Sequence, residues 1–122
     1  MSPITRRVAL AGASLLPFAT PAIAQLKFPE RPIRLIVPWA PGGPADAGFR
    51  ILAESATRIL GQNVIIENKS GASGVLGAVA LQNEKPDGYT ISQMHMSVLR
   101  QPLLNKSLTY HPINDLSYIL QL

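Results

Sequence analysis

Residues 33–48, IRLIVPWAPGGPADAG, join a strand pattern directly to a helix pattern. The first five are mostly apolar and rich in β-branched side chains, which predicts a strand buried on both faces of a sheet. From Ala45, apolar residues recur at steps of three and four as far as Leu60, and Gly61 follows. This pattern predicts an amphipathic helix that ends at a glycine. A stiff loop rich in proline and glycine lies between the two.

The rest of the chain alternates in the same way. Further strands are predicted at residues 63–67, 89–94 and 116–122, and further helices at residues 75–83 and 98–104. Strands that alternate with helices are typical of an α/β fold with a largely parallel sheet and flanking helices. A chain of 122 residues is enough for one small domain of this class.

The first 24 residues have the pattern of a secretory signal peptide. Arg6 and Arg7 precede an apolar stretch too short for a stable membrane anchor, and small residues precede Gln25. We therefore expect cleavage after Ala24, a mature chain of residues 25–122, and a periplasmic location. Paired arginines occur in both Sec and twin-arginine signals, so the export route stays open.

Composition excludes several function classes. The net charge is +4, part of it comes from the signal peptide, and lysine and arginine form no cluster, so binding to nucleic acid is not expected. The chain has no cysteine, which rules out disulfides and thiolate metal sites and fits a bacterial periplasm.

Two glycine-rich loops carry the candidate binding site. The loops at residues 38–44 and 68–74 each run from a strand into a helix, so a parallel sheet places both at the edge where ligands bind. Helix N-termini at this edge present unpaired N–H groups and a partial positive charge, which favour an anion. Glycine exposes the amides, while Pro41 and Pro44 restrict the first loop. A carboxylate or phosphate site is the functional interpretation, and tight turns without a ligand are the alternative.

Four further side chains in the pattern could be functional or structural. Trp39 is either a pocket wall or a core aromatic. Asp46 either caps the following helix or complements its dipole, or else it meets an amine of the ligand. His95 and His111 lack partners at metal-ligand spacing, so we interpret both as structural and expect no metal site.

Catalytic motifs are absent from the sequence. It contains no nucleophile elbow, zinc-protease helix or Walker sequence, and its carboxylates are scattered, so we expect a binding protein rather than an enzyme. Gly71, Gly74 and Gly77 nearly match a dinucleotide-binding fingerprint. An exported nucleotide-binding or enzymatic α/β domain is therefore the alternative prediction.

Four motifs in order resemble the substrate-binding receptors of tripartite tricarboxylate transporters, the Bug family. They are PIRLIVP (32–38) followed by Pro41, Gly42, Gly43 and Asp46, then GQNV (61–64), ENKSGA (67–72) and PDGYT (86–90), and the resemblance continues through YHPINDL (110–116). The resemblance covers nearly all of residues 28–122. It implies a two-lobed, type II-like periplasmic binding fold, with residues 25–122 forming part of the first lobe. It also implies a monomer that needs no cofactor, captures a small organic carboxylate and delivers it to membrane permease subunits.

The resemblance also implies which residues bind the ligand. They are Trp39, Pro41, Gly42, Gly43 and Asp46 in the first loop, Ser70, Gly71, Ala72, Ser73 and Gly74 in the second, and His95 and Ser97 after the third strand.

The chain departs from the family pattern in two ways. Relatives commonly carry proline at the position of Ser70, glycine at Ser73 and a small residue at Pro44. Family members are also much longer, so we expect a fragment without its second lobe, or a non-functional remnant, that binds weakly alone.

Overall fold

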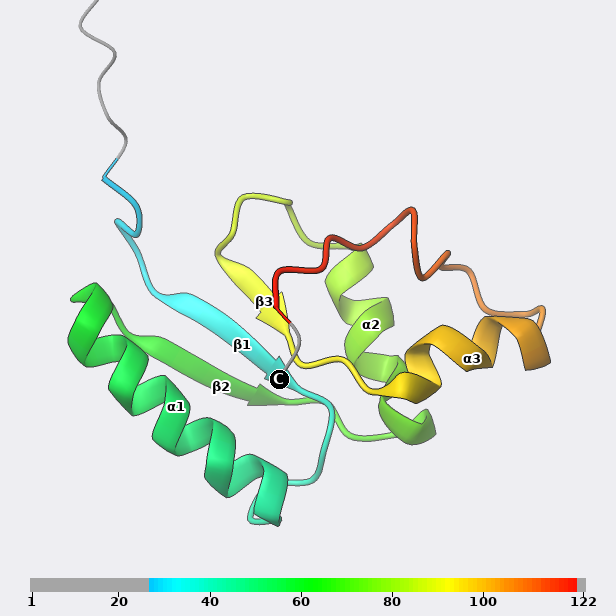
Figure 1. The fold of residues 1–122 in the computed structure, drawn as a ribbon, viewed down its shortest axis with the longest axis horizontal. Helices are drawn as coiled ribbons and strands as arrows, with labels where there is room; N and C mark the ends of the chain where they lie inside the picture. Colours follow the sequence, from blue (N-terminus) through cyan, green and yellow to red (C-terminus); the bar gives the residue numbers. More distant parts are fainter. Residues whose placement is uncertain (1–26, 121–122) are drawn as a thin grey trace, which may run out of the picture.

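The computed structural model describes residues 27–120 and contains a three-stranded parallel sheet with helices on both faces (Figure 1). The predicted signal peptide, residues 1–24, lies outside the described residues. The elements in chain order are β1 (Ile33–Val37), α1 (Pro44–Leu60), β2 (Val64–Asn68), the short 3₁₀ turn η1 (Ala72–Gly74), α2 (Val75–Gln82), β3 (Thr90–Ser92) and α3 (Met96–Leu104).

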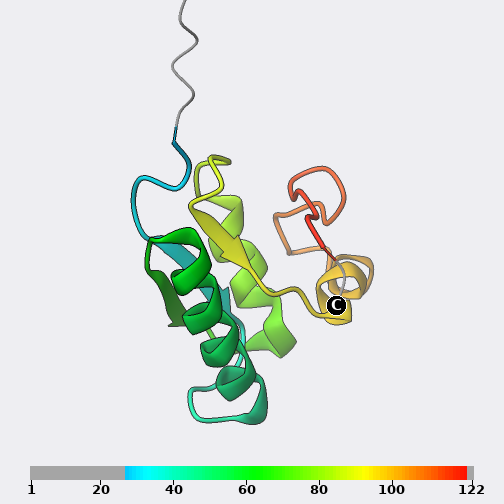
Figure 2. The same cartoon turned by 60° about the vertical axis from the view of Figure 1, so that its left-hand side comes forward.

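The strand order is β2-β1-β3, and both pairs are parallel. The connection from β1 to β2 contains α1 and runs to one side of β1, whereas the connection from β2 to β3 contains α2 and runs back past β1 to its other side. Because both parallel crossovers are right-handed and run in opposite directions, α1 and α2 lie on opposite faces of the sheet (Figure 2). The carboxyl ends of β1 and β3 therefore form a topological switch point, the place where open α/β sheets bind ligands.

The central strand β1 forms the middle of the core, as its continuous apolar run predicts. Ile36 and Val37 are completely buried between α1 and α2. A second cluster joins α2 to α3 and to the segment after it, and consists of Val75, Ala78, Val98, Tyr110 and Leu116. The Tyr110 hydroxyl donates a 2.8 Å hydrogen bond to the Val98 carbonyl, which satisfies its polar end inside this cluster.

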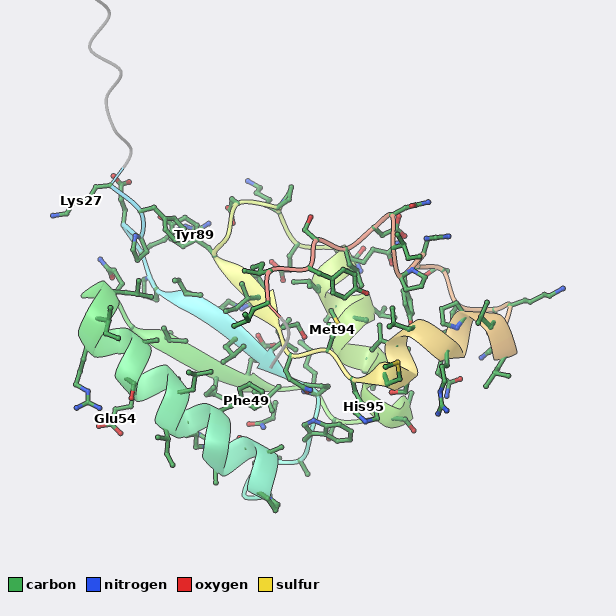
Figure 3. The ribbon with its side chains drawn as sticks, in the orientation of Figure 1. Lys27, Phe49, Glu54, Tyr89, Met94 and His95 are labelled. Atoms are coloured by element: carbon green, nitrogen blue, oxygen red, sulfur yellow. The ribbon has the colours of Figure 1, made fainter. Side chains whose placement is uncertain are left out.

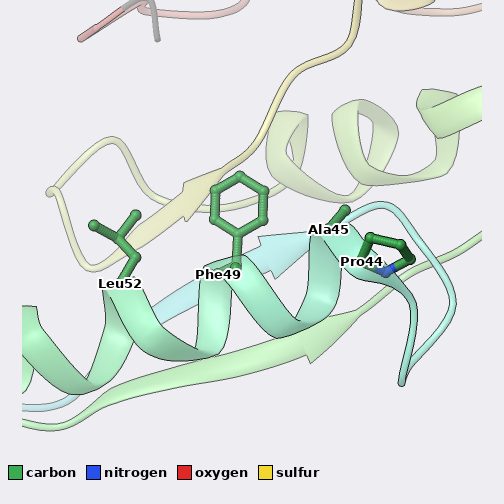
Figure 4. A pocket seen from close by; sticks show the side chains of 5 residues that line it. Pro44, Ala45, Phe49 and Leu52 are labelled. Carbon is green, nitrogen blue, oxygen red and sulfur yellow. The ribbon is translucent and has the colours of Figure 1, made fainter.

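The predicted helix ends are confirmed for α1. Pro44 occupies the first turn, where its missing N–H costs no hydrogen bond. Gly61 follows the last turn in the left-handed conformation, with φ 67°, and donates its N–H to the Thr57 carbonyl. Part of the apolar face of this helix stays exposed. Its residues line the shallow hollow of Figure 4, which contains Pro44, Ala45, Gly48, Phe49 and Leu52.

The predicted strand at residues 116–122 is wrong over the part that the structure describes. Residues 116–120 form no strand and pair with neither edge of the sheet. Leu116 instead packs into the second cluster, while Ile119 and Leu120 are largely exposed. An apolar run becomes a strand only beside a partner strand, and here the side chain of Leu116 holds the segment against α2.

Candidate functional site

The two glycine-rich loops lie together at the carboxyl edge of the sheet, as predicted. Loop 1 (residues 38–43) follows β1, and loop 2 (residues 69–74) follows β2 (Figure 1). The Lys69 N–H donates a 2.9 Å hydrogen bond to the Val37 carbonyl, which joins the starts of the two loops. A Cβ atom on Gly74 would lie 3.7 Å from the Pro38 side chain, so the end of loop 2 also touches loop 1.

Loop 2 has an unusual backbone. Its last four residues all have positive φ: 138° at Gly71, 45° at Ala72, 54° at Ser73 and 92° at Gly74. Non-glycine residues rarely adopt this conformation, so Ala72 and Ser73 are strained. Among residues 27–120, no acceptor pairs with the backbone N–H groups of residues 70–73. Because these residues are also exposed, the loop presents a row of amide donors to solvent.

A second set of donors lies where loop 1 enters α1. Pro44 has no N–H, and the N–H groups of Gly43, Ala45 and Asp46 find no acceptor in the part of the chain that the structure describes. The positive end of the helix dipole adds to the attraction of these amides for a negative charge. Both loops therefore offer backbone donors at one edge of the sheet.

Trp39 connects loop 1 to the segment after β3. Its indole Nε1 donates a 3.0 Å hydrogen bond to Oε1 of Gln93. Its ring meets the His95 ring edge to face, with the centroids 5.4 Å apart. The indole is only partly buried. Trp39 therefore packs against the segment after β3 and is not a fully buried core residue.

His95 and Ser97 hold loop 2 in place. Nδ1 of His95 accepts from the Ser97 N–H at 3.3 Å, which caps the start of α3. The buried Ser97 hydroxyl donates to the Ser73 carbonyl, so α3 is fastened directly to the strained turn. Figure 3 places His95 at the start of α3, beside α2.

Asp46 is buried, with 2% of its surface exposed, and its carboxylate already has partners within the chain. Oδ2 accepts from the Gly42 N–H at 2.9 Å and from Nε of Arg50 at 2.8 Å, and Oδ1 accepts from Nδ2 of Asn68 at 2.8 Å. The Arg50 hydrogen bond, followed by those from Gly42 and Asn68, holds the pKa of Asp46 well below its usual range. Asp46 is an acidic residue in the first turn of α1, and the N-cap residue is Gly43, which has no side chain, so the predicted cap is wrong. The position still places a negative charge at the positive end of the helix dipole, and the carboxylate is already occupied by partners within the chain.

Sequence reasoning missed three polar residues at this edge: Arg50, Asn68 and Gln93. Asn68 is the last residue of β2, and Gln93 directly follows β3, so both stand at carboxyl ends of parallel strands. Polar side chains at such ends are the signal that could have identified them. Arg50 lies one turn after Asp46 on α1, a spacing that favours an ion pair.

The remaining residues singled out by the sequence have structural roles. A Cβ atom on Gly77 would lie 3.1 Å from the Pro38 side chain, so this glycine allows α2 to pack closely on the end of β1. Its place in the near-match to a dinucleotide fingerprint thus has a packing explanation, and the nucleotide-binding alternative has no support. Nδ1 of His111 accepts from the N–H groups of Ile113 and Asn114. Across residues 27–120 there is no cluster of three or more metal-ligating side chains.

Comparison with known proteins gives the family. The profile of the tripartite tricarboxylate transporter family receptor matches residues 48–122. The chain belongs to this receptor family. A Cupriavidus necator relative, the UPF0065 protein in gbd 5'region, is 50% identical over 116 residues, which cover 94% of this chain and 35% of the relative. The family resemblance in the sequence is thereby confirmed.

Solved receptors share the fold. The periplasmic binding protein BugD matches 72% of this chain and 29% of its own, at 43% identity and a TM-score of 0.66. MatC from Rhodopseudomonas palustris, solved with bound malate, matches 72% of this chain and 30% of its own, at 36% identity and a TM-score of 0.63. The α/β unit is thus that of a periplasmic binding protein, and the chain spans about a third of the length of the relatives it matches. Within residues 27–120, the receptor has no helix long and apolar enough to cross a membrane.

Proposed function

We propose that residues 25–122 form part of the first lobe of a periplasmic receptor that captures a small organic carboxylate. The observation that carries this proposal is the row of exposed residues 70–73, whose amides find no acceptor within residues 27–120, beside the amides at the start of α1 that also find none there. Membership of the receptor family and the malate bound to MatC give independent support.

Binding would proceed mainly through backbone groups. One carboxylate oxygen would accept from loop 2 amides and the other from the amides of Gly43 and Ala45, so the negative charge is shared by both loops. The exposed hydroxyls of Ser70 and Ser73 offer further donors. The indole of Trp39 would cover the carbon skeleton of the ligand. Glycines at positions 42, 43, 71 and 74 keep side chains away from the amides.

Strain in loop 2 fits this role. Holding Ala72 and Ser73 at positive φ costs about 1–3 kcal/mol each, and surrounding contacts must offset that cost. The Ser97 hydroxyl, through the Ser73 carbonyl, is one such contact. The donors then face the anion before it arrives, so little ordering is needed on binding.

The wider role follows from the family. We propose that the receptor is exported to the periplasm with cleavage after Ala24, acts as a monomer without cofactor, catalyses no reaction, and passes its ligand to the membrane permease subunits of the transporter. Two lobes that close on a ligand exclude water from its polar contacts, so the affinity of residues 25–122 alone would be low.

Amide NMR shifts of the ¹⁵N-labelled chain test the proposal, because they report weak binding residue by residue. Malate and adipate should shift the signals of residues 43, 45 and 70–73, whereas the uncharged diamide of adipic acid should not. The matched control is Gly48→Ala on α1, which has open space around its Cβ position and should leave these shifts unchanged. Silence across a panel of organic acids, or shifts confined to the opposite edge of the sheet, would contradict the proposal.

A further inference from the structure

We infer that Asp46 and Asn68 are positioning residues that fix loop 1 against the root of loop 2, and that neither contacts the ligand. This inference rests on the proposed function, since it assigns a task to side chains behind the proposed site. It concerns how the donors are held, which neither the family match nor the bound malate of MatC describes.

Loop 1 is fastened at two points, one on each side of Pro41. The Asn68 Nδ2 group donates a 3.0 Å hydrogen bond to the Trp39 carbonyl, and the Gly42 N–H donates to Asp46 at 2.9 Å. The same Nδ2 group donates to Oδ1 of Asp46 at 2.8 Å, so the two fastening points are joined. Because Asn68 also directly precedes loop 2, any movement of loop 1 relative to loop 2 must break one of these bonds.

Arg50 closes the network and balances its charge. Its Nε atom lies 2.8 Å from Oδ2 of Asp46, and another of its nitrogens donates to Oδ1 of Asn68 at 3.3 Å. A buried carboxylate this close to a proposed anion site would repel the ligand if it stood alone. Paired with Arg50, it supplies acceptors for loop 1 at a much smaller electrostatic cost to the bound anion.

The chemistry of the network requires a carboxylate at position 46. Asp46 faces donors only, namely an amide N–H, a guanidinium and the Asn68 amide group. An asparagine at position 46 would turn a second N–H₂ group toward one of these donors. If Asn68 rotated to accept from it, the Trp39 carbonyl would lose its donor, and that half of loop 1 would be released.

Two variants and one control test the inference in the whole chain. Asp46→Asn replaces the charged acceptor, and Asn68→Ala removes the hydrogen bonds of Asn68 to the Trp39 carbonyl, to Oδ1 of Asp46 and from Arg50. Thr57→Val is the matched control, because it deletes a 2.9 Å hydrogen bond between α1 and the Val64 N–H away from both loops. The chain has one tryptophan, Trp39, so its fluorescence emission and acrylamide quenching report loop 1 directly.

Both test variants should increase acrylamide quenching of Trp39 and weaken malate binding about tenfold, as expected for the loss of buried hydrogen bonds to a charged group. Thr57→Val should leave both readouts within twofold of the parent chain. Asn68→Ala keeps the Asp46–Arg50 pair and serves as the test if Asp46→Asn fails to fold. Parent-like quenching and affinity in the folded variants would overturn the inference. If the parent binds no organic acid, the proposed function fails, and Trp39 quenching still decides whether Asp46 and Asn68 hold loop 1.

Discussion

The two ends of the parallel sheet differ in how their polar groups are paired. At the amino end, side chains close the structure: Arg31 pairs with Asp87 at 2.8 Å and lies 4.0 Å above the Tyr89 ring, and the Tyr89 hydroxyl accepts from the Glu30 N–H. At the carboxyl end, amides of loops 1 and 2 find no acceptor in the described part of the chain, and Ala72 and Ser73 of loop 2 have positive φ. Figure 3 shows the two ends, marked by Tyr89 and His95. Side-chain contacts close the amino end, whereas the carboxyl end keeps the donors that we propose bind a ligand.

The largest expected effect comes from disturbing the packing beneath the carboxyl end. Gly77→Val should lower the free energy of unfolding by about 1–3 kcal/mol, because its side chain would collide with Pro38 and force α2 away from β1. Urea denaturation followed by circular dichroism measures the change. Gly48→Ala, at an open position of α1, should instead be neutral or stabilise by up to about 1 kcal/mol. Equal stability of the two variants would argue against close packing at Gly77.

The next largest effect is a loss of stability at the amino end of the sheet that leaves ligand binding at the carboxyl end unchanged. Tyr89→Leu removes the ring that lies 5.0 Å from the Phe28 ring and beneath Arg31. We expect a loss of about 1–2 kcal/mol in unfolding free energy from these contacts, with malate affinity unchanged. Parallel urea titrations and NMR titrations provide the measurement. A loss of affinity in the folded variant would show that the amino end also shapes the site.

A smaller effect should expose the strain in loop 2. Ala72→Gly removes the Cβ that disfavours a φ of 45°, and should raise the free energy of unfolding by about 0.5–1 kcal/mol. The looser loop should bind malate a few-fold more weakly, because more freedom is lost on binding. Ala78→Gly, at a buried position of α2, should have the opposite effect on stability. A destabilised Ala72→Gly chain would contradict strain at this position.

The smallest expected effect is a change with pH in the stability that the Asp46 carboxylate contributes. This change is absent near neutral pH and begins only in acid. Its folded-state pKa lies below the ordinary value of 3.8, so its ionised form contributes stability that is fully present above that value. That contribution is lost only as the pH falls through the folded-state pKa. The stability difference between the parent chain and Asp46→Asn should therefore stay constant from about pH 5 to pH 8 and shrink below about pH 4. Urea denaturation of the ligand-free chains across this range checks it, and a difference that changes near pH 6 would point to another group.

The sequence predicts elements whose signals are local. The apolar run of β1, the helical spacing of α1 and the glycine that follows it all lie within one element, and the structure confirms them. The shared edge of the two loops follows from parallel topology alone. The strand predicted at residues 116–122 is wrong over residues 116–120, because strand pairing depends on a distant partner and Leu116 finds a core position instead.

The side chains that hold the candidate site in place are harder to predict, because they also depend on partners far away in the sequence. Asn68 reaches Trp39 across 29 positions of sequence, and Gln93 reaches it across 54. Local patterns mark Trp39 and Asp46 as unusual but do not say which distant side chains they meet. Positive φ at Ala72 and Ser73 is equally hidden, since neither residue type favours it.

A crystal structure of the chain with malate tests the central claim most directly. We predict one malate carboxylate at the carboxyl edge of the sheet, with its oxygens about 2.7–3.2 Å from backbone nitrogens of both loop 1 and loop 2. Malate bound in the apolar hollow along α1, or held by side chains without either row of amides, would contradict the account.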